Sequence, residues 1–212
     1  MLESFSKEVI EYCESHTFRE HELLDKVEKS THQNSHGSHM ISGAYQGALL
    51  RMLSRLIRPK RILEIGTFTG YSAICMAEGL CEEGKLISME IDEKLKPLIE
   101  KHISWSPFAS KIEVRFGDAK VLLRDVEESF DLIFIDAAKR EYDFYYEESI
   151  RLLNSGGLMV IDNVLWRGKV THSEPDQKTK SIQQFNKKVH EDERVQPFLM
   201  PIRDGIFLVQ KI

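Results

Sequence analysis

Residues 61–72 read Arg-Ile-Leu-Glu-Ile-Gly-Thr-Phe-Thr-Gly-Tyr-Ser, and this stretch decides the fold. A short apolar run leads to Glu64, a loop from Gly66 to Gly70 follows, and Ser72 opens a helix-like segment. A strand that leads into a glycine turn and then a helix N-terminus presents backbone N–H groups to a bound ligand. Dinucleotide enzymes use the spacing G-x-G-x-x-G to approach a pyrophosphate. This chain has G-x-x-x-G, which argues against an NAD-linked dehydrogenase.

The length and composition indicate one soluble domain. A chain of 212 residues can bury a core large enough to be stable without disulfides or a structural metal. A composition of 42% hydrophobic and 30% charged residues is ordinary for a globular protein. We expect a single domain over 1–212, with an N-terminal helical cap (1–57) and a core (61–212). The net charge of −5 argues against a general polyanion binder.

The cysteines and the apolar runs bear on where the protein works. Cys13, Cys75 and Cys81 do not have the spacing of metal ligands, so we expect their side chains to serve packing. This cysteine usage indicates a reducing compartment. No apolar run approaches the roughly 20 residues that cross a bilayer. The first residues are acidic where a signal peptide is basic. These features predict a cytoplasmic protein that does not bind a membrane.

The first 57 residues have helical periodicity. Apolar residues from Ile41 to Ile57 recur at three- and four-residue steps, and Pro59 closes the segment. An earlier amphipathic stretch runs from about Phe18 to Val27. The polar stretch Thr31–His39 between them is predicted to be a loop.

From residue 61 onward, short apolar runs alternate with helical segments. The predicted strands are Arg61–Ile65, Lys85–Glu90, Lys111–Phe116, Leu132–Asp136, Leu158–Ile161, Val195–Met200 and Ile206–Gln210. The predicted helices are Tyr71–Gly79, Glu93–Ile103, Ala119–Val126, Tyr142–Leu153 and Lys178–His190. This alternation predicts a mostly parallel sheet with helices on both faces. The short turn around Arg203-Asp204-Gly205 should join the last two of the seven strands as an antiparallel hairpin.

Polar residues stand where the predicted strands end, and doubly wound sheets bind ligands there. Glu90 ends the second strand, and its carboxylate can accept both hydroxyls of a ribose. The alternative is a solvated acid at a strand end. Gly117-Asp118-Ala119 follows the third strand, where small residues leave room for a flat base.

Three oxygen donors follow the fourth and fifth strands. Asp136 ends one, and Asp162-Asn163 ends the other, so all three should meet at one edge of the sheet. Two carboxylates balance one divalent cation, and Mg²⁺ prefers oxygen ligands. We therefore expect a Mg²⁺ site, with Mn²⁺ or Ca²⁺ as alternatives. The competing interpretation is that Asp162-Asn163 only begins a turn.

Lys139 follows this acidic edge closely. Near a cation and a positively charged cofactor its ammonium form is disfavoured, which suits the lysine to general-base work. The alternative is an ordinary solvated charge.

Residues from about Met40 to Ile212 resemble the cation-dependent class I O-methyltransferases, which include the catechol and caffeoyl-CoA enzymes. The resemblance rests on Met40-Ile-Ser42, Leu63–Ser72, Glu90, Phe134–Lys139, Asp162–Trp166 and Pro201–Gly205. The residues after Asp162 are closer to the caffeoyl-CoA and bacterial branch. The resemblance implies a Rossmann-like methyltransferase fold, S-adenosylmethionine (SAM) as the methyl donor, and a homodimer.

The resemblance also implies roles for individual residues. Cofactor contacts are implied at Ser42, Glu64, Gly66, Thr67, Ser72, Glu90, Ala119 and Asp136. Metal ligands are implied at Asp136, Asp162 and Asn163, and catalytic roles at Lys139 and Asp136. Met40, Trp166 and Arg167 are the tentative substrate contacts.

Two departures from the family pattern concern the substrate. The branch commonly has an acid where this chain has Ala138, and an asparagine where it has Arg167. An arginine there favours an anionic acceptor or is simply solvated. Trp166, Tyr142 and Tyr145 can cover an aromatic ring or serve packing alone.

We therefore expect methyl transfer to a hydroxyl of a small catechol-like or hydroxycinnamoyl aromatic. The first alternative is a hydroxyuridine in tRNA, which the acidic net charge disfavours. A cofactor-binding module without catalysis is the second. The presence of Asp136, Lys139, Asp162 and Asn163 argues against it.

Overall fold

The computed structural model describes residues 6–18 and 22–212. Its strands are β1 (Arg61–Ile65), β2 (Lys85–Glu90), β3 (Ile112–Phe116), β4 (Phe130–Ile135), β5 (Leu153–Ile161), β6 (Val195–Met200) and β7 (Ile206–Lys211). Its α-helices are α1 (Lys7–Ser15), α2 (Glu22–Asn34), α3 (Gly43–Ile57), α4 (Tyr71–Ala77), α5 (Lys96–Ser104), α6 (Ala119–Leu122), α7 (Tyr142–Leu152) and α8 (Gln177–Glu191).

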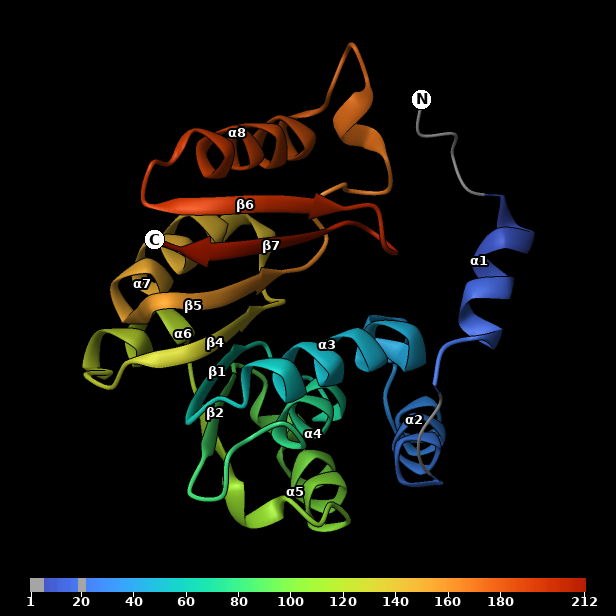
Figure 1. The fold of residues 1–212 in the computed structure, drawn as a ribbon. Coiled ribbons are helices and arrows are strands. Elements are labelled where there is room, and N and C mark those ends of the chain that lie inside the picture. Colours follow the sequence, from blue (N-terminus) through green and yellow to red (C-terminus); the bar gives the residue numbers. More distant parts are fainter. Residues whose placement is uncertain (1–5, 19–21) are drawn as a thin grey trace.

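The strands form one sheet in the order β3-β2-β1-β4-β5-β7-β6 (Figure 1). Strands β1 to β5 pair in parallel, and β7 runs antiparallel to both β5 and β6. This confirms the predicted seven-stranded doubly wound sheet with its C-terminal antiparallel hairpin. Successive strands go outward from β1 in one direction and from β4 in the other. Such a switch point opens a crevice at the carboxyl ends of the two strands.

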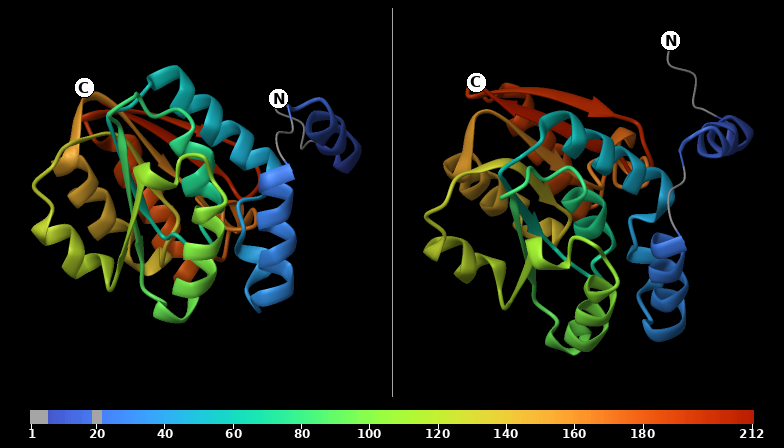
Figure 2. Two further views of the ribbon diagram at one scale, coloured as in Figure 1. Left: turned by 90° about the horizontal axis from the view of Figure 1, so that it is seen from below. Right: turned by 60° about the horizontal axis from the view of Figure 1, so that its bottom comes forward.

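Alternate residues of each strand point to opposite faces, and each face has its own core. Leu63 of β1 belongs to a cluster with residues of α6, α7 and α8, including Tyr142 and Phe185. Ile62 belongs to the cluster on the other face, with Leu50 of α3 and Met76 of α4. Helices therefore cover both faces of the sheet, as Figure 2 shows from two directions.

The N-terminal helices lie beside one end of the sheet (Figures 1 and 2). In α2, Leu24 and Val27 are buried against Tyr71 of α4. The prediction of a loop over Thr31–His39 is wrong for its first four residues, because α2 continues to Asn34. Thr31 is fully buried and shares a hydrogen bond of 2.9 Å with the hydroxyl of Thr69 in the glycine loop. That tertiary contact outweighs the weak helix preference of a polar run.

The predicted segment Phe18–Val27 is only partly testable, since residues 19–21 lie outside the described residues; α2 begins at Glu22. Other boundaries also shift. The helix predicted over Ala119–Val126 is α6, which has four residues, followed by a 3-10 turn over Leu123–Asp125. Strand β5 begins at Leu153, five residues before the predicted start, because it continues through Gly156 and Gly157. Within the described ranges, no helix is long and apolar enough to cross a membrane.

Candidate active site

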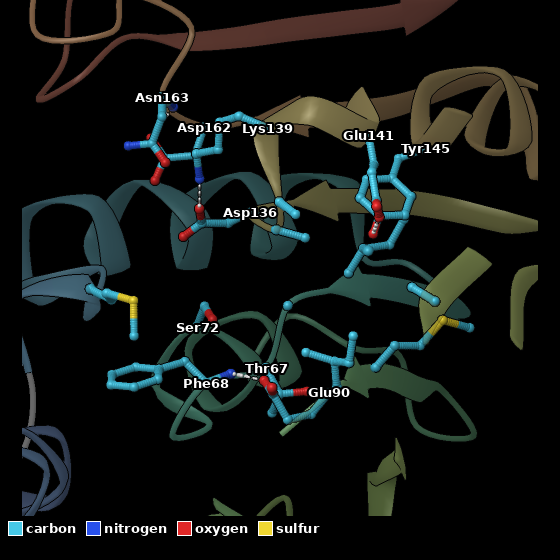
Figure 3. A pocket seen from close by; sticks show the side chains of 18 of the residues that line it. Thr67, Phe68, Ser72, Glu90, Asp136, Lys139, Glu141, Tyr145, Asp162 and Asn163 are labelled. Carbon is cyan, nitrogen blue, oxygen red and sulfur yellow. Dashed lines mark hydrogen bonds and ion pairs between the residues drawn. The ribbon is translucent and has the colours of Figure 1, made fainter. Parts of the chain in front are cut away.

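A cavity of about 1050 Å³ opens at the carboxyl ends of the parallel strands. Its volume is at the upper end of the range for small-molecule sites, so it has room for two ligands side by side. The predicted site residues that line it are Met40, Ser42, Gly66, Thr67, Ser72, Glu90, Ala119, Asp136, Lys139, Asp162, Asn163, Trp166 and Arg167. Figure 3 shows Asp136, Asp162 and Lys139 on one side of the cavity. Thr67 and Phe68 of the glycine loop lie with Glu90 on another side.

Glu64 is the one predicted site residue outside this lining. Its side chain points to the α4 face of the sheet and is fully buried. The hydroxyl of Ser72 donates to one carboxyl oxygen at 2.5 Å, and the hydroxyl of Ser88 donates to the other. Burial raises the pKa of Glu64 to about 8 in spite of these bonds. Glu64 thus lies beneath the glycine loop and supports Ser72, which does line the cavity.

The glycine loop is held by backbone contacts that only glycine permits at its first position. Gly66 has φ +103, and a Cβ atom there would lie 2.2 Å from the carbonyl oxygen of Asp136. The N–H groups of Gly66 and Thr67 both donate to the carbonyl oxygen of Met89, at 3.0 and 3.1 Å. The loop therefore packs directly against the ends of β2 and β4.

Glu90 faces the cavity and holds the same loop. One of its carboxyl oxygens accepts the N–H of Phe68 at 2.7 Å (Figure 3). The other accepts the N–H of Asp92 at 2.8 Å. Phe68 has φ +50, a left-handed conformation that is rare outside glycine. Burial raises the pKa of Glu90 above the usual value of 4.5. Each oxygen keeps a lone pair for a hydroxyl group of a ligand.

Two carboxylates form the acidic edge. The Nζ atom of Lys139 lies 2.8 Å from Oδ1 of Asp136 (Figure 3). Asp162 is 4% exposed; its Oδ2 accepts from the side-chain amide of Gln46 at 2.8 Å and its Oδ1 from the N–H of Asn163 at 2.6 Å. Burial, followed by the negative charge of Asp136, raises the pKa of Asp162 to about 6. A further positive charge at this edge would stabilise the ionised form of Asp162 against both effects.

The chemistry of this donor set fits a hard divalent cation. No three side chains of His, Cys, Asp or Glu cluster as metal ligands in the described ranges 6–18 and 22–212. The predicted set contains two carboxylates and the amide of Asn163, and such oxygen donors suit Mg²⁺. Each oxygen of Asp162 has one protein donor and a remaining lone pair, so ligation leaves the existing bonds intact.

Three cavity-lining residues near the acidic edge have left-handed backbone conformations. Asn163, Trp166 and Arg167 have φ values of 59, 50 and 55. The N–H of Arg167 donates to Asp204, and the side-chain amide of Asn163 lies 3.5 Å from the same carboxylate. Residues in such conformations persist where the surroundings hold them, often at functional sites. Asp204 is the group that holds Asn163 and Arg167.

The sequence did not indicate Gln46, and it did not predict the contacts by which Tyr142, Arg203 and Asp204 contribute to the site. The hydroxyl of Tyr142 donates to the backbone carbonyl of Asp162 at 2.9 Å, so this ring both packs in the core and supports the acidic edge. Gln46 and Arg203 connect Asp162 to the segment before α3. Their contacts join residues far apart in the sequence, and no local pattern indicates them.

Comparison with known proteins identifies relatives along almost the whole chain. The family described as O-methyltransferase matches residues 14–212. A mouse protein named catechol O-methyltransferase domain-containing protein 1 is 34% identical over 208 residues, covering 95% of this chain and 79% of its own. Caffeoyl-CoA O-methyltransferase 1 of Eucalyptus globulus is 36% identical over 186 residues, covering 82% and 75%. The crystal structure of an SAH-bound methyltransferase from Podospora anserina superposes with a TM-score of 0.91 at 25% identity, covering 100% and 99%.

Proposed function

Since the chain belongs to the O-methyltransferase family and is a SAM-dependent O-methyltransferase of the caffeoyl-CoA and catechol type, we propose that it uses a divalent cation to methylate a small aromatic bearing adjacent hydroxyls. One observation carries this proposal. Asp136, Asp162 and Asn163 line the same cavity as the glycine loop and Glu90. The donor, the cation and the acceptor would therefore share one space.

The proposed donor site uses the loop side of the cavity. Glu90 would accept the ribose hydroxyls, while Gly66, Thr67 and Ser72 would line the amino-acid end of SAM, with Ser42 opposite. Ala119 would leave room for the adenine. Glu64 would act through Ser72, because it has no exposed surface of its own.

The proposed cation site uses Asp136, Asp162 and Asn163. A bound Mg²⁺ ion supplies Lewis-acid stabilisation of negative charge on an acceptor oxygen. The protein's own contribution is to hold two carboxylates at a buried edge, where Asp162 is disfavoured as an isolated anion. Adjacent hydroxyls on one aromatic ring match this arrangement, since both oxygens can approach the same edge.

Lys139 is the proposed general base. In the reaction an O–CH₃ bond forms while the S–CH₃ bond breaks, so the sulfonium becomes a neutral thioether and the hydroxyl proton passes to Lys139. The Nζ atom of Lys139 lies 2.8 Å from Oδ1 of Asp136, so the proposed base is adjacent to the proposed cation site. Positioning of the two reactants supplies much of the rate gain.

The proposed acceptor site lies next to Trp166, with Met40 and Arg167 at its edges. Trp166 is half-buried, so one part of its ring is available to cover an aromatic substrate. Arg140, Arg167, Lys169 and Lys178 also line the cavity and add positive charge to it. This positive charge favours an acceptor that carries an anionic group. It also makes tRNA the second candidate substrate, since phosphates would meet the same side chains.

The test is methyl transfer from labelled SAM to a catechol, a hydroxycinnamoyl thioester and undermodified tRNA, each with Mg²⁺ and with excess EDTA. We expect transfer to a small aromatic that EDTA abolishes. Asp162→Ala should lose the cation-stimulated rate and retain SAH binding, whereas the control Asp143→Ala on the exposed side of α7 should behave as wild type. Full turnover in excess EDTA would refute the cation role. Transfer to tRNA alone would replace the aromatic substrate.

Two further expectations belong to this proposal. We expect a homodimer, supported by the exposed apolar residues Val9, Ile10 and Tyr12 of α1. Sedimentation at several concentrations measures this, and a monomer at micromolar concentration contradicts it. We also expect a cytoplasmic location and a single functional domain over 1–212.

A further inference from the structure

A chain of hydrogen bonds runs from Asp162 to the segment that precedes α3. The side-chain amide of Gln46 donates from Nε2 to Oδ2 of Asp162 at 2.8 Å. The guanidinium of Arg203 donates to Oε1 of Gln46 at 3.1 Å, and to the carbonyl oxygen of Ile41 at 3.3 Å. Gln46 lies on α3, Arg203 in the turn between β6 and β7, and Asp162 just after β5. Three separate parts of the chain thus meet in one network.

The chemistry of the groups fixes the direction of this network. A guanidinium only donates hydrogen bonds, so the oxygen of the Gln46 amide must face Arg203. The NH₂ group then faces Asp162, where it can only donate, and it favours the ionised carboxylate. Gln46 is fully buried, so its amide has no water to turn toward. Without Arg203 the buried Oε1 atom would lose its partner, and a rotated amide would place oxygen against the carboxylate.

Arg203 has a backbone conformation that is unfavourable for a residue with a side chain. Its φ of 50 is left-handed, a conformation that glycine adopts freely and a side chain adopts at a cost in free energy. The side chain is directed at the two acceptors by this turn, and its own fork of donors spans them. The backbone carbonyl of Asp162 is fixed separately by the hydroxyl of Tyr142. Gln46 and the N–H of Asn163 are therefore the groups that set the orientation of the Asp162 side chain.

The other end of the network is the wall of the donor side. Ile41 and Ser42 line the cavity together with Gly66 and Ser72, and Ser42 is the residue directly before α3. A donor that packs against this wall also fixes the carbonyl oxygen to which Arg203 donates. We propose that Gln46 and Arg203 are positioning residues that orient Asp162 for the cation and couple cation binding to occupancy of the donor site.

This inference rests on the proposed function, because it requires a cation at Asp162. Gln46 and Arg203 take no part in the proposed methyl transfer itself. Coupling between two sites is reciprocal, and its usual size is about 5- to 150-fold in affinity. Loss of a group that orients a metal ligand usually weakens metal affinity by about 10- to 100-fold. These two magnitudes separate the role of Gln46 from that of Arg203.

The experiment measures the Kd of Mn²⁺ by calorimetry, without and with saturating SAH. For the wild type we expect at least about fivefold tighter Mn²⁺ binding with SAH. Gln46→Leu should weaken Mn²⁺ binding about tenfold or more in both conditions. Arg203→Gly should remove most of the difference in Mn²⁺ affinity between the SAH-bound and the SAH-free protein. Its matched control is Arg58→Gly, since Arg58 is also exposed and left-handed, with φ 52, and lies at the far end of α3.

Each outcome bears on a defined claim. A wild-type protein that binds no Mn²⁺ refutes the cation site of the proposed function, and this inference with it. Mn²⁺ binding that is the same in Gln46→Leu and wild type overturns the inference alone. Equal affinity with and without SAH in the wild type overturns the coupling. Should Gln46→Leu fail to fold, Arg203→Gly decides the matter, because its side chain is exposed and glycine suits its backbone.

Discussion

Gly66 and Asp136 are in such close contact that a Cβ atom on the glycine would lie 2.2 Å from the aspartate's carbonyl oxygen. The proposed donor loop and the proposed cation edge are therefore one packed unit. A change at Gly66 should disturb both sites at once.

We predict that Gly66→Ala lowers the free energy of unfolding by about 1–3 kcal/mol or more and weakens SAH binding. The reason is that the added Cβ atom would overlap the backbone carbonyl oxygen of Asp136, which cannot move aside. Urea denaturation and SAH titration measure the two effects. The control is Gly156→Ala, which has φ +77 but no atom within 4 Å of its added Cβ, and should lose only about 1–2 kcal/mol. Equal losses in the two variants would show that the backbone angle, and not the contact with Asp136, explains the effect.

Glu90→Ala should raise the Kd of SAH about tenfold or more, since a hydrogen bond to a charged group contributes about 1.5–3 kcal/mol. Phe68 would also lose the acceptor of its N–H group. Because burial raises the pKa of Glu90, SAH binding should begin to weaken on acidification while the pH is still above 4.5. Calorimetry over a pH series tests this, with Glu127→Ala, exposed and remote from the cavity, as the control. An unchanged Kd removes Glu90 from the donor site.

Lys139→Ala should reduce kcat by about 10²- to 10⁴-fold, the usual contribution of a general base, and leave the Kd of SAH nearly unchanged. Lys139→Arg retains a positive charge beside Asp136 but does not release a proton, so it should be equally slow. Single-turnover rates measure the chemical step. Lys120→Ala is the matched control, because Lys120 also lines the cavity and pairs with a carboxylate, that of Glu141 at 2.9 Å. A normal rate for either Lys139 variant contradicts the base assignment.

The protonation of Glu64 should make stability fall as pH rises. Its folded pKa of about 8 exceeds the usual 4.5, so the folded state holds a proton that the unfolded state releases. This contribution is complete below pH 4.5 and is lost as pH rises through about 8, with a slope of at most about 1.4 kcal/mol per pH unit. Glu64→Gln should flatten this dependence in urea denaturation between pH 5 and 9. A slope identical to wild type would show that Glu64 is already ionised.

The predicted fold succeeded because its evidence was local. Strand ends and helix starts follow from periodicity, and the turn around Arg203–Gly205 correctly indicated the antiparallel hairpin. The loop prediction for Thr31–His39 failed because a tertiary hydrogen bond from Thr31 to Thr69 stabilises the last turn of α2. Composition alone does not contain that contact.

The candidate site was partly predictable for the same reason. Glu90, Asp136 and Asp162 stand at strand ends, and parallel strands bring their ends to one edge. Glu64 has the same local setting, yet strand alternation turns it toward α4 and away from the cavity. Gln46 and Arg203 reach Asp162 only through the folded arrangement, so their roles could not be predicted from neighbours in the sequence.

The turn before β7 also has a consequence for folding kinetics. The N–H groups of Val164 and Leu165, just after the acidic edge, donate to the carbonyl oxygens of Gly205 and Asp204. These partners belong to the turn that leads into β7, so the two bonds can form only once that turn is in place. We therefore expect the amide hydrogens of Val164 and Leu165 to gain exchange protection together with β7. The edge that holds Asp162 would then be completed only when the last strand joins the sheet.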